Sequence, residues 1–138
     1  MTDSHPRPLQ TTTVTSVDDL AELWRSLMAG GGFGRRTLWL VLLDDAGHPA
    51  PVVVPIDDIP TYPGRKDVRA FGTVLAGIAP LGTPVLLLSR PGCGEVQDGD
   101  RRWAEALAPL APAWPVHLAT ADVDDSSAPC TVRALRVS

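Results

Sequence analysis

The chain has 138 residues, the length of a single domain, and its 44% hydrophobic and 20% charged residues are typical of a globular protein rather than a disordered one. Two cysteines are too few for a disulfide scaffold, and no apolar run approaches the roughly 18–20 residues of a membrane span. The formal net charge is −4 and the basic residues are scattered, so we expect neither nucleic-acid binding nor a membrane partner.

The N-terminal segment differs in composition from the rest of the chain. Residues 1–15 are polar and include two prolines and three consecutive threonines, so we expect a disordered tail. The segment lacks the apolar core of a signal peptide, and we therefore expect a cytoplasmic protein with free thiols at Cys93 and Cys130. Residues 16–138 are predicted to form a single α/β domain.

The first predicted helix begins at Ser16 and ends at the glycines 30–32. Ser16 and Asp19 have the spacing of a capping box, with Asp in the place of the usual Glu. Apolar residues then recur at the third and fourth positions, which is the pattern of an amphipathic helix. They are Leu20, Leu23, Trp24, Leu27 and Met28.

Apolar runs of strand length alternate with two further helical patterns. Strands are predicted over residues 37–43, 51–56, 85–88, 116–120 and 130–137, and helices over 67–78 and 100–110. A turn over 45–47 joins the first two strands, and Pro51 and Pro55 place the second strand at an edge or beside a bulge because proline has no N–H to donate. The order α-β-β-α-β-α-β-β indicates an α/β fold with a single mixed sheet flanked by helices.

Four aromatic residues lie on the inward stripes of different predicted elements. Trp24, Phe71 and Trp103 belong to the three helices, and Trp39 belongs to the first strand. We expect all four to converge on one core.

Residues able to carry chemistry are few. Asp98 or Asp100 is placed to cap the third helix. Cys93 lies near Arg90, a positive charge that favours the thiolate, and a catalytic cysteine would need His117 as its base. The three His and two Cys show no paired spacing such as CxxC or HExxH, so we expect no metal and no cofactor.

Residues 86–119 read LLLSRPGCGEVQDGDRRWAEALAPLAPAWPVHLA. This stretch resembles the metal-site region of the RadC-type branch of the JAB/MPN family, in which an apolar strand precedes a His-x-His-Pro motif, a loop, an Asp that opens a helix, and a later strand carrying Asp-His. Pro91-Gly92 is similar to the family's Pro-Ser-Gly with one residue missing, Asp100 falls at the ligand Asp, and Val116-His117 falls on the Asp-His pair with only the His kept. The resemblance covers residues 20–138 in the order of elements and implies a JAB/MPN-like fold of the cytidine-deaminase-like type.

The sequence departs from that family at the metal ligands. Leu88 and Arg90 occupy the two His positions, and Asp100 cannot hold zinc alone because catalytic zinc sites normally have three protein ligands. No glutamate is placed to be the upstream general base. The glutamates are Glu22, Glu95 and Glu105.

The resemblance therefore implies a degenerate, non-catalytic member that serves as a scaffold for binding or assembly, with a protein partner or a second copy of the chain. The remaining cleft would be lined by Ser89, Arg90, Asp100 and His117, with an Arg90–Asp100 ion pair in the former metal position. Two alternatives stay open. One is a small-anion sensor in which Arg90 meets a carboxylate or phosphate, and the other is an enzyme of another class that uses Cys93 or Asp100 with His117.

Overall fold

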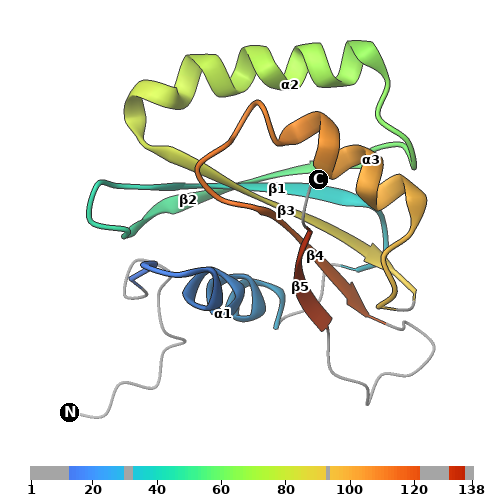
Figure 1. Cartoon of the computed structure of the whole chain (residues 1–138), viewed down its shortest axis with the longest axis horizontal. Helices are drawn as coiled ribbons and strands as arrows, with labels where there is room; N and C mark the ends of the chain where they lie inside the picture. The colour runs from blue at the N-terminus through green and yellow to red at the C-terminus, as the bar shows by residue number, and fades with distance from the viewer. Residues whose placement is uncertain (1–12, 30–32, 93, 122–130, 136–138) are drawn as a thin grey trace.

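The computed structural model describes residues 13–29, 33–92, 94–121 and 131–135. Most of the expected tail lies outside these ranges, and so do Cys93 and Cys130. The described residues form three layers, in which one mixed sheet separates a single helix from a pair of helices (Figure 1). This arrangement confirms an α/β fold with a mixed sheet flanked by helices.

Three α-helices, one short 3₁₀ turn and five strands make up the described part of the chain. The helical segments are α1 (Val17–Met28), α2 (Arg65–Ile78), the 3₁₀ turn η2 (Ala79–Leu81) and α3 (Asp98–Leu107). The strands are β1 (Thr37–Leu43), β2 (Pro49–Asp57), β3 (Thr83–Pro91), β4 (Val116–Ala121) and β5 (Thr131–Leu135). None of the helices described here has both the length and the apolar character needed to cross a membrane.

The sheet has the strand order β2-β1-β3-β4-β5. Strand β1 pairs antiparallel with β2 and β3, β3 pairs parallel with β4, and β4 pairs antiparallel with β5. The parallel pair is joined through α3, because parallel strands need a long crossover connection. Strand β2 lies at an edge, as its prolines predict, and its register against β1 shifts between Val41 and Leu43.

Ser16 caps the N-terminus of α1, as the sequence predicts, but the second bond of the capping box has a different partner from the usual one. The Asp19 amide donates to Ser16 Oγ at 3.1 Å. The Asp19 carboxylate accepts from the amide and hydroxyl of Thr15, at 3.0 and 2.8 Å, and so reaches one residue further back than in the usual box. These bonds hold the pKa of the Asp19 carboxyl below its ordinary range.

The turn between β1 and β2 depends on Gly47. Its φ is +87°, which favours glycine, and a Cβ at this position would collide with the carbonyl oxygen of Val14. That close approach comes from a backbone bond in which the Val14 amide donates to the Gly47 carbonyl at 2.8 Å. The segment before α1 is thereby tied to the hairpin turn.

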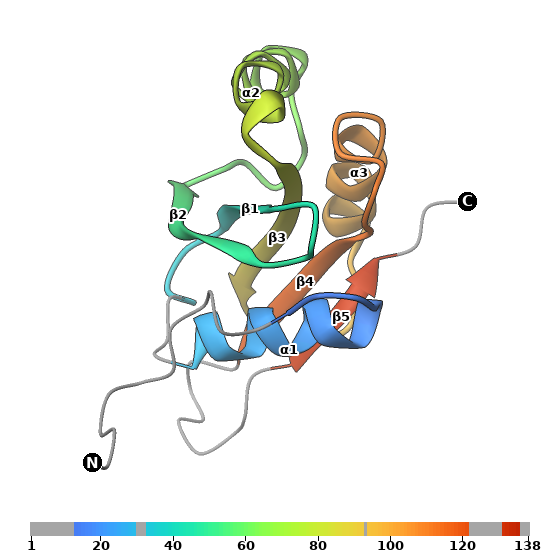
Figure 2. The ribbon, with the colours of Figure 1, turned by 90° about the vertical axis from the view of Figure 1, so that its left-hand side faces the viewer.

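The four aromatic residues do not converge on one core, so that expectation is wrong. Figure 2 shows α1 on one face of the sheet and the pair α2 and α3 on the opposite face. Trp24 and Trp39 belong to the cluster on the α1 side, whereas Phe71 and Trp103 belong to a second cluster on the side of α2 and α3. The reason is the alternation of side chains along a strand. Leu87 faces the α1 side, for example, and its neighbours Leu86 and Leu88 face the other.

The ends of the third helix also differ from the prediction. Helix α3 begins at Asp98 and ends at Leu107, whereas the apolar pattern predicts residues 100–110. Gln97 is the N-cap residue, so Asp100 lies in the first turn and not at the start of the helix. Leu110 lies beyond the end of α3 and still packs against the second cluster. Periodicity extends past a helix end when the following loop packs on the same side.

Candidate functional site

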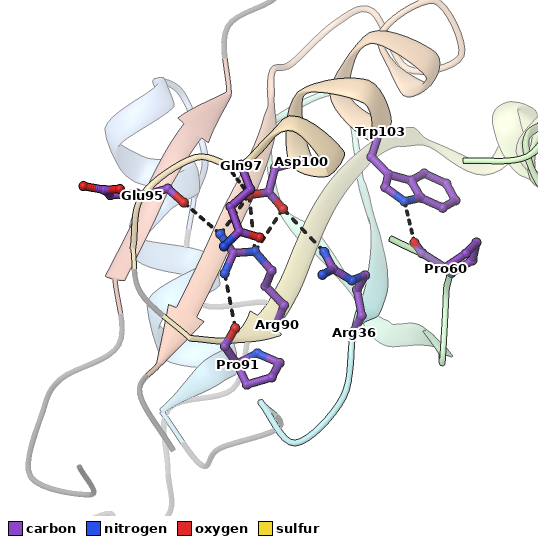
Figure 3. Close-up of polar contacts among 8 residues, drawn as sticks. All are labelled: Arg36, Pro60, Arg90, Pro91, Glu95, Gln97, Asp100 and Trp103. Atoms are coloured by element: carbon purple, nitrogen blue, oxygen red, sulfur yellow. Dashed lines mark hydrogen bonds and ion pairs between the residues drawn. The ribbon is translucent and has the colours of Figure 1, made fainter. Parts of the chain in front are cut away.

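The end of β3 and the first turn of α3 bring Arg90 and Asp100 into direct contact (Figure 3). Arg90 Nε donates to Asp100 Oδ1 at 3.0 Å, and Arg90 Nη2 donates to Asp100 Oδ2 at 2.8 Å. Only 2% of the Arg90 side chain and 1% of the Asp100 side chain are exposed. The two residues form a buried bidentate ion pair, the geometry in which Arg and a carboxylate bind most strongly.

The Arg90 guanidinium also holds the loop that follows β3. Nη1 donates to the Pro91 carbonyl at 3.2 Å, and Nη2 donates to the Glu95 carbonyl at 2.8 Å. Figure 3 shows these bonds converging on the guanidinium from the strand end and from the loop. A charge buried in this way is tolerated because its donors are satisfied on several sides.

The Asp100 carboxylate is held from three directions. In addition to Arg90, its Oδ2 accepts from the amide of Gln97 at 2.8 Å, which satisfies one of the amide donors at the start of α3. Its Oδ1 lies 3.6 Å from Arg36 Nη1. The partial positive charge at the helix N-terminus also stabilises a carboxylate there.

Arg36 was not predicted from the sequence as part of this site. It directly precedes β1, and the pairing of Thr37 with Ser89 brings it beside the end of β3. Its side chain is 22% exposed, so it connects the buried ion pair with solvent. Burial lowers the pKa of the Arg36 guanidinium and Arg90 lowers it further, while Asp100 acts in the opposite direction. Two guanidinium groups therefore share one carboxylate.

Ser89 and His117 lie on the opposite face of the sheet from Arg90 and Asp100. His117 pairs with Leu87 and Ser89 pairs with Ala119, whose side chains face α1. Ser89 Oγ accepts from Trp39 Nε1 at 2.8 Å. All four predicted site residues are buried. The structure therefore brings Arg90 and Asp100 together but does not place Ser89 and His117 in a common cleft with them.

His117 is buried with an unpartnered ring nitrogen. Its Nδ1 lies 3.2 Å from the Pro115 carbonyl oxygen, and its Nε2 has no hydrogen-bond partner among the described residues. Burial lowers the pKa of the imidazole, the bond to Pro115 raises it, and the charge of Arg25 on α1 lowers it further. His117 is therefore a buried core residue whose pKa lies below its ordinary value.

The remaining sequence predictions concern Cys93 and a metal site. Cys93 falls outside the described residues. Within the described ranges, no three His, Cys, Asp or Glu side chains are grouped so that they could hold a metal ion. Leu88, which the resemblance aligns with a histidine, packs in the apolar cluster on the α3 side.

A cavity of about 270 Å³ lies on the same side of the sheet, and sequence reasoning missed it. Its walls come from β1, β2, the segment after β2, α2 and Trp103 of α3. Three of its lining residues, Asp57, Asp58 and Asp67, are acidic. The sequence offers no local signal for it, because the space forms only where α2 packs across from β2.

No family model, curated protein or solved structure matches this chain.

Proposed function

We propose that the chain is a non-catalytic domain of the RadC-type JAB/MPN-like architecture and that it serves as a scaffold for binding or assembly. In this proposal the Arg90–Asp100 pair takes the place that a metal centre has in the catalytic members. The observation that carries the proposal is the contact itself, because it joins the second His position of the motif to the position of the ligand Asp.

The surroundings of the pair support this interpretation. Leu88 and Arg90 are two residues apart on β3 and therefore point to the same face, as two metal-binding histidines would have to do. Asp100 lies across from them in the first turn of α3. A permanent guanidinium charge compensates the carboxylate without a metal ion.

The position of His117 gives no support to the enzyme alternative. A general base must come within hydrogen-bond reach of the group it serves. His117 lies on the α1 side of the sheet, whereas Asp100 lies on the α3 side and already accepts bonds from Arg90 and the Gln97 amide. The proposal therefore assigns both residues to the structure of the domain and not to a reaction.

Zinc binding by a restored motif tests the proposal. Leu88→His together with Arg90→His provides two imidazoles facing Asp100, and we expect this variant to bind about one zinc ion per chain, with water as a fourth ligand. Adding Asp100→Ala should abolish that binding. The unchanged chain should carry no stoichiometric zinc, as measured by elemental analysis after gel filtration.

Two results would contradict the proposal. One is about one zinc per chain in the unchanged protein, which would mean that other ligands form a metal centre. The other is a double variant that keeps the far-ultraviolet circular dichroism spectrum of the parent but binds no zinc. In that case Leu88 and Arg90 do not stand at metal-ligand positions.

The shared carboxylate favours anion binding as a second candidate function. The cluster of Arg36, Arg90 and Asp100 has two positive groups and one negative group, and Arg36 is its solvent-reaching member. A small oxyanion would meet Arg36 and not the buried Arg90. Saturable thermal stabilisation by phosphate or sulfate that is lost in Arg36→Gln would support this candidate, and equal stabilisation of both proteins would indicate a nonspecific salt effect.

A further inference from the structure

The cavity on the α2 side is formed by packed side chains that leave space between them. Helix α2 contributes Phe71 and Val74, the sheet contributes Leu38 and Ile56, and Trp103 of α3 closes the inner end. Phe71 and Trp103 are buried. Trp103 is also held in place, because its Nε1 donates to the Pro60 carbonyl at 2.9 Å. The inner wall is therefore apolar, aromatic and preformed.

The outer part of the same cavity is open and apolar. Val74 lines it, and 46% of the surface of Val74 is exposed. Ile56 and Ile59 are only partly buried. The volume of about 270 Å³ equals that of roughly nine water molecules at about 30 Å³ each. A compound of about ten non-hydrogen atoms would fill this space.

The charge at the mouth of the cavity is negative. Asp57, Asp58 and Asp67 are exposed and line the cavity, and no basic residue lines it. Asp58 pairs with Arg35 at 3.1 Å. The Asp57 carboxylate accepts from the hydroxyl of Thr37, which lies on the α1 side of the sheet, so it faces away from the cavity. Among the residues described, Asp67 has no basic partner, and its carboxylate accepts from the Gly64 amide. A ligand whose apolar part enters the cavity would thus meet carboxylates with its other end.

We infer that this cavity is a binding site for a small apolar amine of the arylalkylamine class. The ring lies against Phe71 and Trp103, and the ammonium group meets the carboxylate of Asp67, which lies one helical turn before Phe71 on the same face of α2. Small-molecule sites are concave and mostly apolar, with few polar groups that fix orientation and selectivity. The limited volume favours a free amine over a folded segment of a partner protein. This inference does not depend on the JAB/MPN-like proposal, since it uses none of the residues of the Arg90–Asp100 pair.

Three probes of similar size and different charge test the inference on the full-length chain. They are 2-phenylethylammonium, the neutral 2-phenylethanol and the anionic phenylacetate. We expect 2-phenylethylammonium to bind saturably in isothermal titration calorimetry and to raise Tm. The alcohol should bind about tenfold more weakly, and the carboxylate should give no measurable binding. The amine's affinity should fall with added salt, because the carboxylates are exposed.

Variants separate the charged mouth from the apolar wall. Asp67→Asn should weaken binding of the amine about tenfold and leave binding of the alcohol unchanged. Ala70→Trp, at an exposed position that lines the cavity, should fill the space and abolish binding of both compounds. The matched control is Asp45→Asn in the hairpin turn, which removes an exposed carboxylate far from the cavity in the sequence and should change neither affinity.

Several outcomes would overturn the inference. Equal affinity for the amine and the alcohol would mean that the carboxylates play no part. Absence of saturable binding by the amine, or unchanged binding after Ala70→Trp, would mean that the cavity is not the site. Thermal unfolding of each variant without ligand establishes that it is folded, and a change in affinity counts only for a variant that unfolds cooperatively.

Discussion

Arg90 and Asp100 are joined at two points, with Nε 3.0 Å from Oδ1 and Nη2 2.8 Å from Oδ2, and both side chains are almost completely buried. They connect the end of a central strand with the first turn of α3. Additional bonds from Arg90 to the Pro91 and Glu95 carbonyls extend the contact to the intervening loop. The pair thus fixes the position of α3 relative to the sheet.

The first prediction is strong energetic coupling between these two side chains. Arg90→Ala leaves a buried carboxylate with only Arg36 and the Gln97 amide, so the free energy of unfolding should fall by about 3–5 kcal/mol. Removing both charges should cost clearly less than the sum of the two single losses, with a coupling energy of about 1–3 kcal/mol. A double-mutant cycle with Arg90→Ala and Asp100→Ala, measured by urea unfolding, provides this value.

The exposed pair of Arg35 and Asp58 is the matched control for that cycle. Its nitrogen–oxygen distance of 3.1 Å is similar, but its side chains are 58% and 71% exposed. The corresponding cycle should give a coupling energy of about 0–1 kcal/mol, because water and salt screen exposed pairs. Additive losses at Arg90 and Asp100 would show that the buried pair has no special role in stability.

The second prediction separates the packing of Trp103 from its hydrogen bond. Trp103→Ala should reduce the free energy of unfolding by about 3–5 kcal/mol, because it opens a large hole beside α2 and α3. Trp103→Phe keeps an aromatic ring and removes mainly the bond to the Pro60 carbonyl, so it should cost about 1–2 kcal/mol. A loss below about 1 kcal/mol for the alanine variant would mean that α3 does not pack on the second cluster as described.

The third prediction uses two glycines that lie in helices but in different surroundings. A Cβ at Gly77 in α2 would meet nothing within 4 Å, so Gly77→Ala should stabilise the domain by about 0.5–1 kcal/mol through helix propensity. A Cβ at Gly99 in α3 would collide with the backbone carbonyl of Thr61, so Gly99→Ala should destabilise by about 1–3 kcal/mol despite the same gain in propensity. Chemical unfolding should show a higher free energy of unfolding for Gly77→Ala and a lower one for Gly99→Ala than for the unchanged protein.

The fourth prediction concerns the dependence of stability on pH. The pKa of His117 in the folded protein lies below its ordinary value of 6.5, chiefly because burial disfavours the charged imidazole. The unfolded chain therefore takes up a proton first as the pH falls below about 6.5. This contribution to stability is complete above that pH and decreases below it, by at most about 1.4 kcal/mol per pH unit.

Unfolding experiments between pH 7.5 and 5 measure this effect when the variants are compared. In His117→Gln the free energy of unfolding should fall less steeply as the pH is lowered, because the buried imidazole no longer contributes. Identical pH profiles for His117→Gln and the unchanged protein would contradict the prediction.

Local sequence patterns predict most elements and several of their ends. The Ser16 cap, the edge position of the proline-containing strand β2 and the class of the fold all follow from local chemistry. The contact of Arg90 with Asp100 was also expected, but that expectation came from the resemblance to a known metal-site region. Each of these features depends on neighbouring residues or on a short motif, and a sequence displays such information directly.

The remaining features depend on which face of the sheet each side chain occupies and on how distant segments meet. Alternation along β3 and β4 sends Arg90 to the α3 side and Ser89 and His117 to the α1 side, so one expected cleft became two separate environments. Arg36 reaches Asp100 only because β1 pairs with β3. The cavity beside Trp103 exists only where α2, α3 and β2 approach one another.

The residue sequence by itself determined the elements and their periodicity, because these result from local interactions. The tertiary structure decided the faces, the third partner of the ion pair and the cavity, because these result from contacts between residues far apart in the chain.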